Sequence, residues 1–275
     1  MDAIEEARIP YQWQKNCKIL HLVRHGQAWH NLEGDSNRDA LLSPHLFDAQ
    51  LSPTGFKQVA ELRKHVHTSG LLNTIELVIT SPLSRAMQTA VGGFGLEGHR
   101  NDDGDIVSGS AVSTLNTPKI MAVELCRDRL GVRPCDMRRK VSDCRSHFPS
   151  IDFSMIDSED DNIWNPNLRE SEEKLAKRVV ELLKWLWTRP EKEIVIVSHG
   201  KILQQILIGS LGKDDDPAAR AALCKRFDHC ELRSVVILDK SKMGRDSSPS
   251  LSCCGHQEDD VVKLSGNFQL IDWRC

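Results

Sequence analysis

Short apolar runs recur along the chain, and longer amphipathic or polar segments separate them. The first run, residues 19–23, is nearly continuously hydrophobic, which is typical of a strand buried on both faces of a parallel sheet. Similar runs predict strands over residues 76–80, 119–125, 193–198 and 234–238. We expect the last of these strands at an edge of the sheet.

Between these runs, apolar residues recur at helical spacing. The pattern predicts a helix over residues 57–67, and Ser52 as N-cap with Pro53 at the first helical position marks its start. Two further helices are predicted over residues 172–187 and 201–211. Strands that alternate with helices indicate an α/β fold, a doubly wound and mostly parallel sheet with helices on both faces.

The length and composition of the chain fit one large domain with a short extension. We predict a domain over residues 1–240, a flexible Ser- and Asp-containing linker over 241–260, and a tail over 261–275 that packs back on the domain as a strand. Residues 32–50 are rich in Asp, Asn, Ser and Pro. A loop of this length in a compact domain is usually functional, and we expect it to fold over the ligand pocket.

Charge and cysteine content exclude several classes of protein. The formal net charge is −3, so no field over the whole molecule attracts nucleic acid or an anionic membrane. Nine cysteines are scattered without a paired C-x-x-C spacing, which favours reduced thiols over a disulfide framework or a zinc site. No apolar run approaches the roughly 20 residues of a membrane span, and residues 1–16 lack the apolar core of a signal peptide. We expect a cytoplasmic protein, with the nucleus as a second location.

Two of the predicted strands end in a histidine followed by a glycine. Arg24 and His25 follow the first strand, and His199 follows the strand over residues 193–198. Open α/β sheets bind ligands at the carboxyl ends of their strands. A third segment places Arg85 in the first turn of a helix that begins near Pro82, and the free N–H groups of a helix N-terminus favour a bound anion. Together these residues predict a pocket for a phosphate.

Four motifs stand in a fixed order along the chain. They are LVRHGQAWHN at residues 22–31, LSPTG at 51–55, TSPLSRAMQTA at 80–90 and VSHG at 197–200. In this order they resemble the histidine phosphatase superfamily, in its phosphoglycerate mutase-like branch. With ELCRDRLGVRPCDMRRK at residues 124–140 included, the chain resembles the plant phosphoglycerate mutase-like proteins. The resemblance covers roughly residues 17–240 and implies the phosphoglycerate mutase-like fold.

The resemblance also implies a role for each residue of the predicted pocket. His25 is the nucleophile that becomes phosphohistidine, and its attacking nitrogen must be unprotonated. Arg24 and Arg85 bind phosphoryl oxygens in two-point contacts that Lys could not reproduce. His199 stabilises charge on the phosphoryl group, and Asn31 contacts the phosphate. No metal and no cofactor are implied.

The identity of the general acid stays open at this point. The family has a Glu just beyond the third strand, typically as Leu-x-Glu, but here Arg127 stands two residues after Leu125. The nearest carboxyl groups are Glu124, which strand alternation turns away from Leu125, and Asp128, which requires a shift of one residue. Either could serve. The basic run over residues 138–140 could bind a second anionic group of the substrate or form a solvated face.

Departures from the familiar mutases favour hydrolysis over phosphoryl transfer within the substrate. The chain has Ala28 where they commonly have Ser, Lys201 where they have Asn, and a different segment after the third strand. We therefore predict a phosphatase that acts on a small phosphorylated metabolite, with sugar phosphates favoured only by analogy. The alternatives are a phosphoglycerate mutase and a non-catalytic module that binds phosphate or phosphopeptides. The sequence does not predict the oligomeric state.

Overall fold

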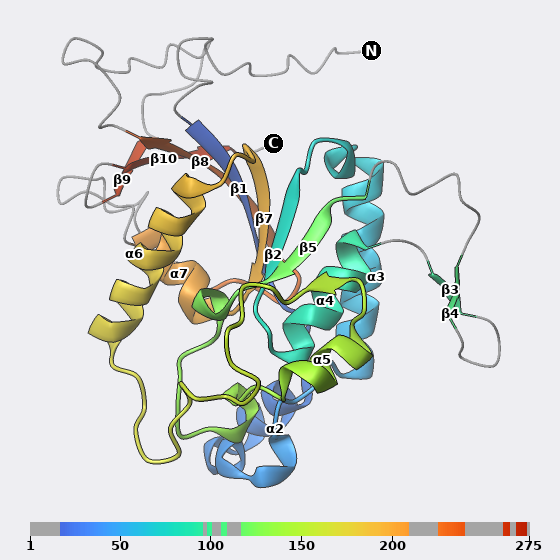
Figure 1. The fold of residues 1–275 in the computed structure, drawn as a ribbon, viewed down its shortest axis with the longest axis vertical. Helices are drawn as coiled ribbons and strands as arrows, with labels where there is room; N and C mark the ends of the chain where they lie inside the picture. The colour runs from blue at the N-terminus through green and yellow to red at the C-terminus, as the bar shows by residue number, and fades with distance from the viewer. Residues whose placement is uncertain are drawn as a thin grey trace.

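A computed structural model describes residues 17–95, 98–100, 106–108, 117–208, 225–239, 261–264 and 268–273. Its centre is an eight-stranded sheet with the strand order β6-β5-β2-β7-β1-β8-β10-β9 (Figure 1). The strands of this sheet are β1 (Cys17–Arg24), β2 (Leu77–Thr80), β5 (Lys119–Ala122), β6 (Ile151–Asp152), β7 (Glu193–Ser198), β8 (Leu232–Asp239), β9 (Val261–Leu264) and β10 (Phe268–Trp273). The described helices are α2 (Trp29–Ser36), α3 (Pro53–Thr68), α4 (Ser84–Phe94), α5 (Val141–His147), α6 (Glu172–Thr188) and α7 (Gly200–Ile208).

The strands on one side of β8 run parallel to one another. β7 pairs in parallel with both β1 and β2, β2 with β5, and β5 with β6, whereas β8 is antiparallel to β1. The predicted α/β class with a mostly parallel sheet is confirmed. The expected edge position of β8 is wrong, because β10 pairs with its free side and β9 follows beyond β10.

Helices cover both faces of the sheet. In Figure 1, α6 and α7 lie on one side of the strands and α3, α4 and α5 on the other. Successive strand residues point to opposite faces, so Leu22 and Ile196 pack with α6 and α7, while Val23 and Val197 pack with α3 and α4. Burial of each such side chain stabilises the fold by roughly 1.5–3 kcal/mol. The strand ends are therefore held firmly at one edge of the sheet.

The predicted helix starts and strands agree with the structure at several places. Ser52 caps α3, where its side chain accepts a hydrogen bond from the backbone N–H of Gly55 at 3.1 Å. The strand predicted over residues 193–198 has those bounds in β7. The strand predicted over 119–125 is shorter, because the chain turns into a 3-10 helix at Glu124–Cys126.

The expectation of an irregular loop over residues 32–50 is wrong. This segment contains most of α2 and two 3-10 helices, Arg38–Leu42 and Pro44–Leu46, and in Figure 1 α2 lies beyond the carboxyl ends of the central strands. The two large apolar side chains of α2, Trp29 and Leu32, are exposed, so the helix has no buried apolar face that could predict it. Instead, Leu41 and Leu46 bury their side chains and anchor the segment.

Three further observations complete the fold. A two-stranded sheet pairs β3 (Gly98–Arg100) with β4 (Ile106–Ser108). The proposed linker, residues 241–260, and the lead-in, residues 1–16, lie outside the described residues. Within the described ranges, no helix combines the length and apolar character needed to cross a bilayer.

Candidate active site

The two His-Gly turns meet at the carboxyl ends of neighbouring strands. Arg24 of β1 lies beside Ser198 of β7 in parallel register, and the backbone N–H of His25 donates to the carbonyl of Ser198 at 3.0 Å. The imidazole rings of His25 and His199 consequently have centroids 5.0 Å apart. The structure thus brings together side chains that are more than 170 residues apart in the sequence.

The His25 side chain is in the state that a nucleophile requires. Its ring is buried, and Nδ1 lies 2.7 Å from the carbonyl oxygen of Gly26. Because a carbonyl only accepts, Nδ1 carries the proton and the lone pair is on Nε2. Burial lowers the pKa of His25 well below its usual value, and the charges of Arg85 and His199 lower it further. The imidazole is therefore neutral at pH 7 and free to attack through Nε2.

The LSPTG motif supports the turn that carries His25. The backbone N–H of Ser52 donates to the carbonyl of Gln27 at 2.9 Å, and Gly55 packs so closely that an added Cβ would lie 2.0 Å from the same oxygen. On the other side, the N–H of Gly26 donates to the Thr89 hydroxyl at 3.0 Å. Residues 51–55 thus hold the backbone after His25 in place, which explains the glycine at position 55.

Arg85 lies fully buried at the start of α4. Its Nη1 donates to the carbonyl of Cys135 at 2.6 Å and its Nη2 to Asp136 at 3.0 Å. These bonds fix the guanidinium plane, and Nε has no partner among the described residues. A fixed, dehydrated guanidinium is well suited to bind phosphoryl oxygens in two-point contacts.

Arg24 is held by the segment that leads into β8. Its Nη1 donates to the carbonyl of Phe227 at 2.7 Å, while its Nε has no partner within the described part of the chain. Burial and the nearby charge of Arg226 lower the pKa of Arg24 to about 10. Arg24 therefore remains cationic at neutral pH.

The structure separates the two carboxyl groups considered for the general acid. Asp128 lines the cavity, and its Oδ2 lies 3.7 Å from Nδ1 of His199 and 3.8 Å from Nη2 of Arg85. Glu124 does not line it: its carboxylate pairs with Arg127 at 3.1 Å and with Arg138 at 2.7 Å. The prediction that Glu124 could lie at the site is wrong, because the 3-10 turn after β5 directs its side chain into this ion-pair network.

Asp128 and Asp136 share Arg85, and their pKa values move in opposite directions. For Asp128, burial raises the pKa, but His199, Arg85 and the backbone N–H of Arg129 outweigh it, so the pKa lies well below the usual range. For Asp136, burial and the charge of Asp128 raise the pKa. Asp128 thus carries a negative charge in the unliganded site.

Asn31 lines the cavity as predicted, but most of its amide is occupied by protein contacts. Its Oδ1 accepts from the backbone N–H of Ala28 at 3.0 Å, and its Nδ2 lies 3.1 Å from Nε2 of His30. His30 was not predicted from the sequence. Its ring is buried, and the centroid lies 5.8 Å from that of His25. The signal was its position beside Asn31 within the first motif.

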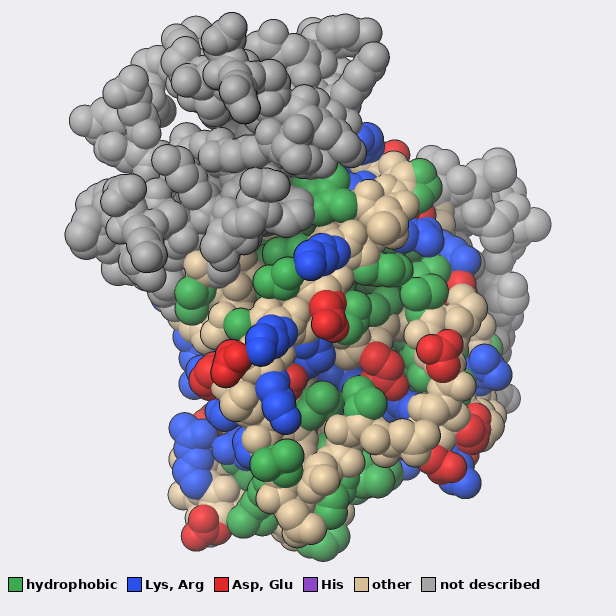
Figure 2. Space-filling model, turned by 60° about the vertical axis from the view of Figure 1, so that its left-hand side comes forward, with side chains coloured by type: hydrophobic (Ala, Val, Ile, Leu, Met, Phe, Trp, Pro, Cys, Tyr) green, Lys and Arg blue, Asp and Glu red, His purple; other side chains and the backbone are tan. Residues whose placement is uncertain are grey.

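A cavity of about 380 Å³ lies beside these residues and is strongly cationic; Arg24, His25 and Asp128 line it, whereas the fully buried Arg85 and His199 do not. Its basic lining residues are Arg24, Arg38, Arg129, Arg133, Arg169, Lys201 and Arg226, and its acidic ones are Asp35, Asp128 and Asp136. The positive charge is local, because on the face shown in Figure 2 basic and acidic side chains are interspersed. Among the described residues, no cluster of His, Cys, Asp or Glu is arranged to hold a metal ion.

The basic run over residues 138–140 does not line this cavity. Arg138 is buried in ion pairing with Glu124, and Arg139 and Lys140 pair with Asp48 and Asp160. These ion pairs stabilise the loop after β5. Binding of a second anionic group of the substrate, one of the two roles considered for this run, is not supported.

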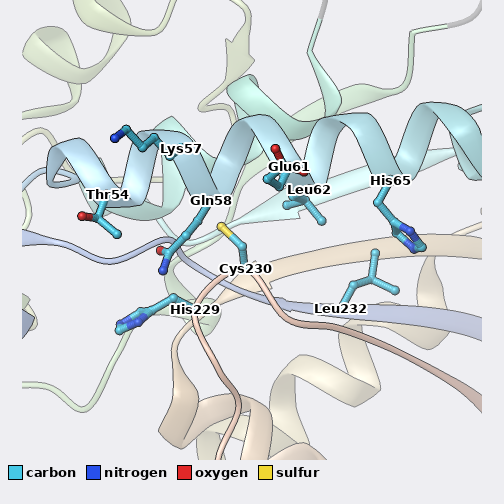
Figure 3. A pocket seen from close by; sticks show the side chains of 9 residues that line it. All are labelled: Thr54, Lys57, Gln58, Glu61, Leu62, His65, His229, Cys230 and Leu232. Atoms are coloured by element: carbon cyan, nitrogen blue, oxygen red, sulfur yellow. The ribbon is translucent and has the colours of Figure 1, made fainter.

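A second cavity, of about 440 Å³, lies between α3 and the segment that leads into β8 (Figure 3). It contains none of the predicted site residues. His229 lines it, and the His229 ring centroid also lies 6.0 Å from that of His25. Burial, with the charges of Arg24 and Arg226, lowers the pKa of His229 to about 4. No sequence motif indicated His229.

Comparisons with known proteins agree with this geometry. The sequence model of the histidine phosphatase superfamily (branch 1) matches residues 20–96 and 140–242. The chain is 48% identical to Phosphoglycerate mutase-like protein 1 of Arabidopsis thaliana over 242 residues, covering 84% of this chain and 85% of that protein. It is 45% identical to a second Arabidopsis thaliana phosphoglycerate mutase-like protein over 259 residues, covering 91% and 95% of the two chains.

The fold is also similar to that of a solved structure. A candidate alpha-ribazole-5'-P phosphatase from Escherichia coli aligns with a TM-score of 0.50 at 19% identity, covering 80% of this chain and 91% of that one. At this identity the likeness concerns the fold alone. Taken with the family match and the two Arabidopsis relatives, it leads to one conclusion: this chain belongs to the histidine phosphatase superfamily.

Proposed function

We propose that the protein is a phosphatase that hydrolyses a small phosphorylated metabolite through a phosphohistidine intermediate on His25. The observation that carries this proposal is the hydrogen bond from His25 Nδ1 to the Gly26 carbonyl, which leaves the Nε2 lone pair free on a ring that lies 5.0 Å from that of His199 between centroids and close enough to Arg24 and Arg85 for their charges to lower its pKa. Two guanidinium groups and a second imidazole can neutralise the phosphoryl oxygens around that nitrogen.

The reaction proceeds in two displacements at phosphorus. In the first, His25 Nε2 forms a bond to phosphorus, the ester P–O bond breaks, and the leaving oxygen takes the proton of Asp128. In the second, water attacks the phosphohistidine, its proton passes to Asp128, the N–P bond breaks, and inorganic phosphate leaves. Asp128 is ionised in the unliganded site. It takes up a proton from solvent when the substrate dianion binds, because the negative charge of the substrate raises the pKa of Asp128.

The rest of the cavity favours a metabolite with a second anionic group, such as a carboxylate or another phosphate. Arg38, Arg133 and Arg226 line the cavity, and their guanidinium groups make no hydrogen bond or ion pair with the described residues. One phosphoryl group needs only Arg24 and Arg85. Arg38, Arg133 and Arg226 can bind a second anion in the cavity, with charge-assisted hydrogen bonds.

A phosphoglycerate mutase is the alternative, favoured by the names of the Arabidopsis relatives. A mutase returns the phosphoryl group from His25 to a second hydroxyl of the substrate. It would interconvert 3- and 2-phosphoglycerate faster than it releases inorganic phosphate, whereas the proposed phosphatase releases phosphate from either one.

Phosphate release from a panel of metabolites tests both proposals. The panel pairs substrates that have the phosphoryl group as their single anionic group, such as simple alkyl phosphates, with phosphorylated acids and bisphosphates of similar size. We expect release that His25→Ala abolishes, and higher kcat/KM for substrates with a second anion. Absence of His25-dependent release from every substrate would leave the non-catalytic phosphate-binding module.

A further inference from the structure

The hydrogen bonds around Asn31 determine which nitrogen of His30 carries a proton. The backbone N–H of Ala28 can only donate, so the Asn31 atom that it contacts at 3.0 Å is the amide oxygen. The other end of the amide is then the NH₂ group, which donates to His30 Nε2 at 3.1 Å. Nε2 must therefore accept with its lone pair, and the proton of the neutral ring resides on Nδ1.

His30 Nδ1–H is an N–H donor without a protein acceptor. The side chain lines the phosphate cavity, the residue is only 8% exposed, and Nδ1 has no hydrogen-bond partner among the described residues. The His30 ring lies 5.8 Å from that of His25 between centroids. A buried N–H donor that has no partner is costly, so an oxygen of a bound ligand would satisfy it.

We propose that His30 contacts the substrate by donating its Nδ1–H to an oxygen of the phosphoryl group bound at His25, and that Asn31 is a positioning residue that sets the tautomer of His30. The inference rests on the proposed phosphate site, and it adds a second role to the predicted phosphate contact of Asn31. With Oδ1 on the Ala28 N–H and one amide N–H on His30, Asn31 holds the His30 ring, and its second N–H remains for the phosphate.

Affinity for inorganic phosphate, measured by calorimetry, tests the contact without requiring turnover. His30→Phe keeps the ring but removes the donor, and we expect roughly 10- to 100-fold weaker binding, the range for one hydrogen bond to a charged group. His30→Asn can place an amide N–H near the Nδ1 position, so it should retain more affinity than His30→Phe. The matched control is His21→Phe, a buried imidazole of β1 that bonds Ser234 and Glu193 outside the cavity and should leave the affinity unchanged. Equal affinity of wild type and His30→Phe would overturn the proposal.

Nitrogen-15 NMR of labelled histidine tests the tautomer directly. We expect His30 to be protonated at Nδ1 in the wild type, and its Nδ1 resonance to shift when inorganic phosphate is added. Asn31→Ala should lose the single tautomer and weaken phosphate binding, but it should cost little further affinity in the His30→Phe background. A proton on Nε2, or fully additive effects of the two substitutions, would contradict the positioning role.

These experiments separate the two proposals. If the wild type binds phosphate through His30 but hydrolyses no substrate in a His25-dependent way, the phosphatase proposal fails and the His30 contact stands. If the wild type hydrolyses phosphate esters and His30→Phe leaves kcat/KM and phosphate affinity unchanged, the His30 contact fails and the phosphatase proposal stands. If the wild type binds no phosphate, the His30 contact fails, and His25-dependent hydrolysis alone decides the phosphatase proposal.

Discussion

Replacement of Asp128 by Asn tests the proton donor of the reaction. The substitution keeps the size of the side chain but removes the proton that the leaving oxygen needs. Asp128 is the carboxyl group that faces the site, 3.8 Å from Arg85 Nη2 and 3.7 Å from His199 Nδ1. General acid catalysis contributes roughly 100- to 10,000-fold to rates, so we expect a loss of that size for alkyl phosphates.

The charge of the substrate determines whether Asp128 can hold that proton. Two unit charges about 4 Å apart interact by about 4 kcal/mol at an effective dielectric constant near 20, which is about three pKa units at 1.36 kcal/mol each. A phosphoryl dianion at such a distance therefore raises the low pKa of Asp128 toward neutral pH. We expect the acid to become protonated in the complex with substrate.

Steady-state hydrolysis of an alkyl phosphate and of 4-nitrophenyl phosphate measures the effect. Nitrophenolate leaves without a proton, so Asp128→Asn should reduce its kcat/KM, which reports the first displacement, by less than about 10-fold, while kcat/KM for alkyl phosphates falls at least about 100-fold. The matched control is Glu124→Gln, whose carboxylate pairs with Arg127 and Arg138 outside the cavity. An equal loss of kcat/KM for both substrates in Asp128→Asn would refute the assignment. A larger loss of kcat/KM for the alkyl phosphate than for the nitrophenyl ester in Glu124→Gln would refute it as well.

Three other perturbations follow from the site. Arg85→Lys loses the two-point contact and the bonds to Cys135 and Asp136, so kcat/KM should fall about 100- to 1,000-fold; an effect under 10-fold would contradict this. The pKa of His25 in the folded state lies below its unfolded value near 6.5, so the C2–H resonance of His25 in NMR should show no midpoint near pH 6.5. Below about pH 6.5 the unfolded chain binds a proton that the folded protein does not, so the contribution of His25 to the free energy of unfolding, full above pH 6.5, should decline by up to about 1.4 kcal/mol per pH unit. Gly55→Ala crowds the Gln27 carbonyl and should destabilise the fold by roughly 1–3 kcal/mol in denaturant titrations, whereas a value near zero would contradict the close contact.

The features that sequence patterns predicted well depend on local signals. An apolar run that ends in His-Gly indicates a buried strand and its carboxyl end, and both β1 and β7 have this form. Ser52 with Pro53 marked the start of α3 for a similar reason, since N-cap preferences involve only adjacent residues. Because parallel neighbours end at one edge, the meeting of His25 and His199 followed from these two signals.

The features that were missed depend on contacts distant in sequence. β8 was placed at an edge because its pairing with β10 involves a segment about 30 residues further along the chain. The choice between Glu124 and Asp128 required the 3-10 turn after β5 and the arginines that hold Glu124. His30 was overlooked because α2 buries it near His25, and the sequence of α2 has no buried apolar face that would predict this helix.

The central claim is that a phosphoryl group is transferred to His25. Rapid quenching during the first turnover, with a substrate labelled in its phosphoryl group, followed by digestion and mass spectrometry at alkaline pH, detects that intermediate directly. We expect an acid-labile phosphoryl group on the peptide that contains His25, with none in His25→Ala. Turnover without a labelled protein, or a label on His199 in place of His25, would contradict it.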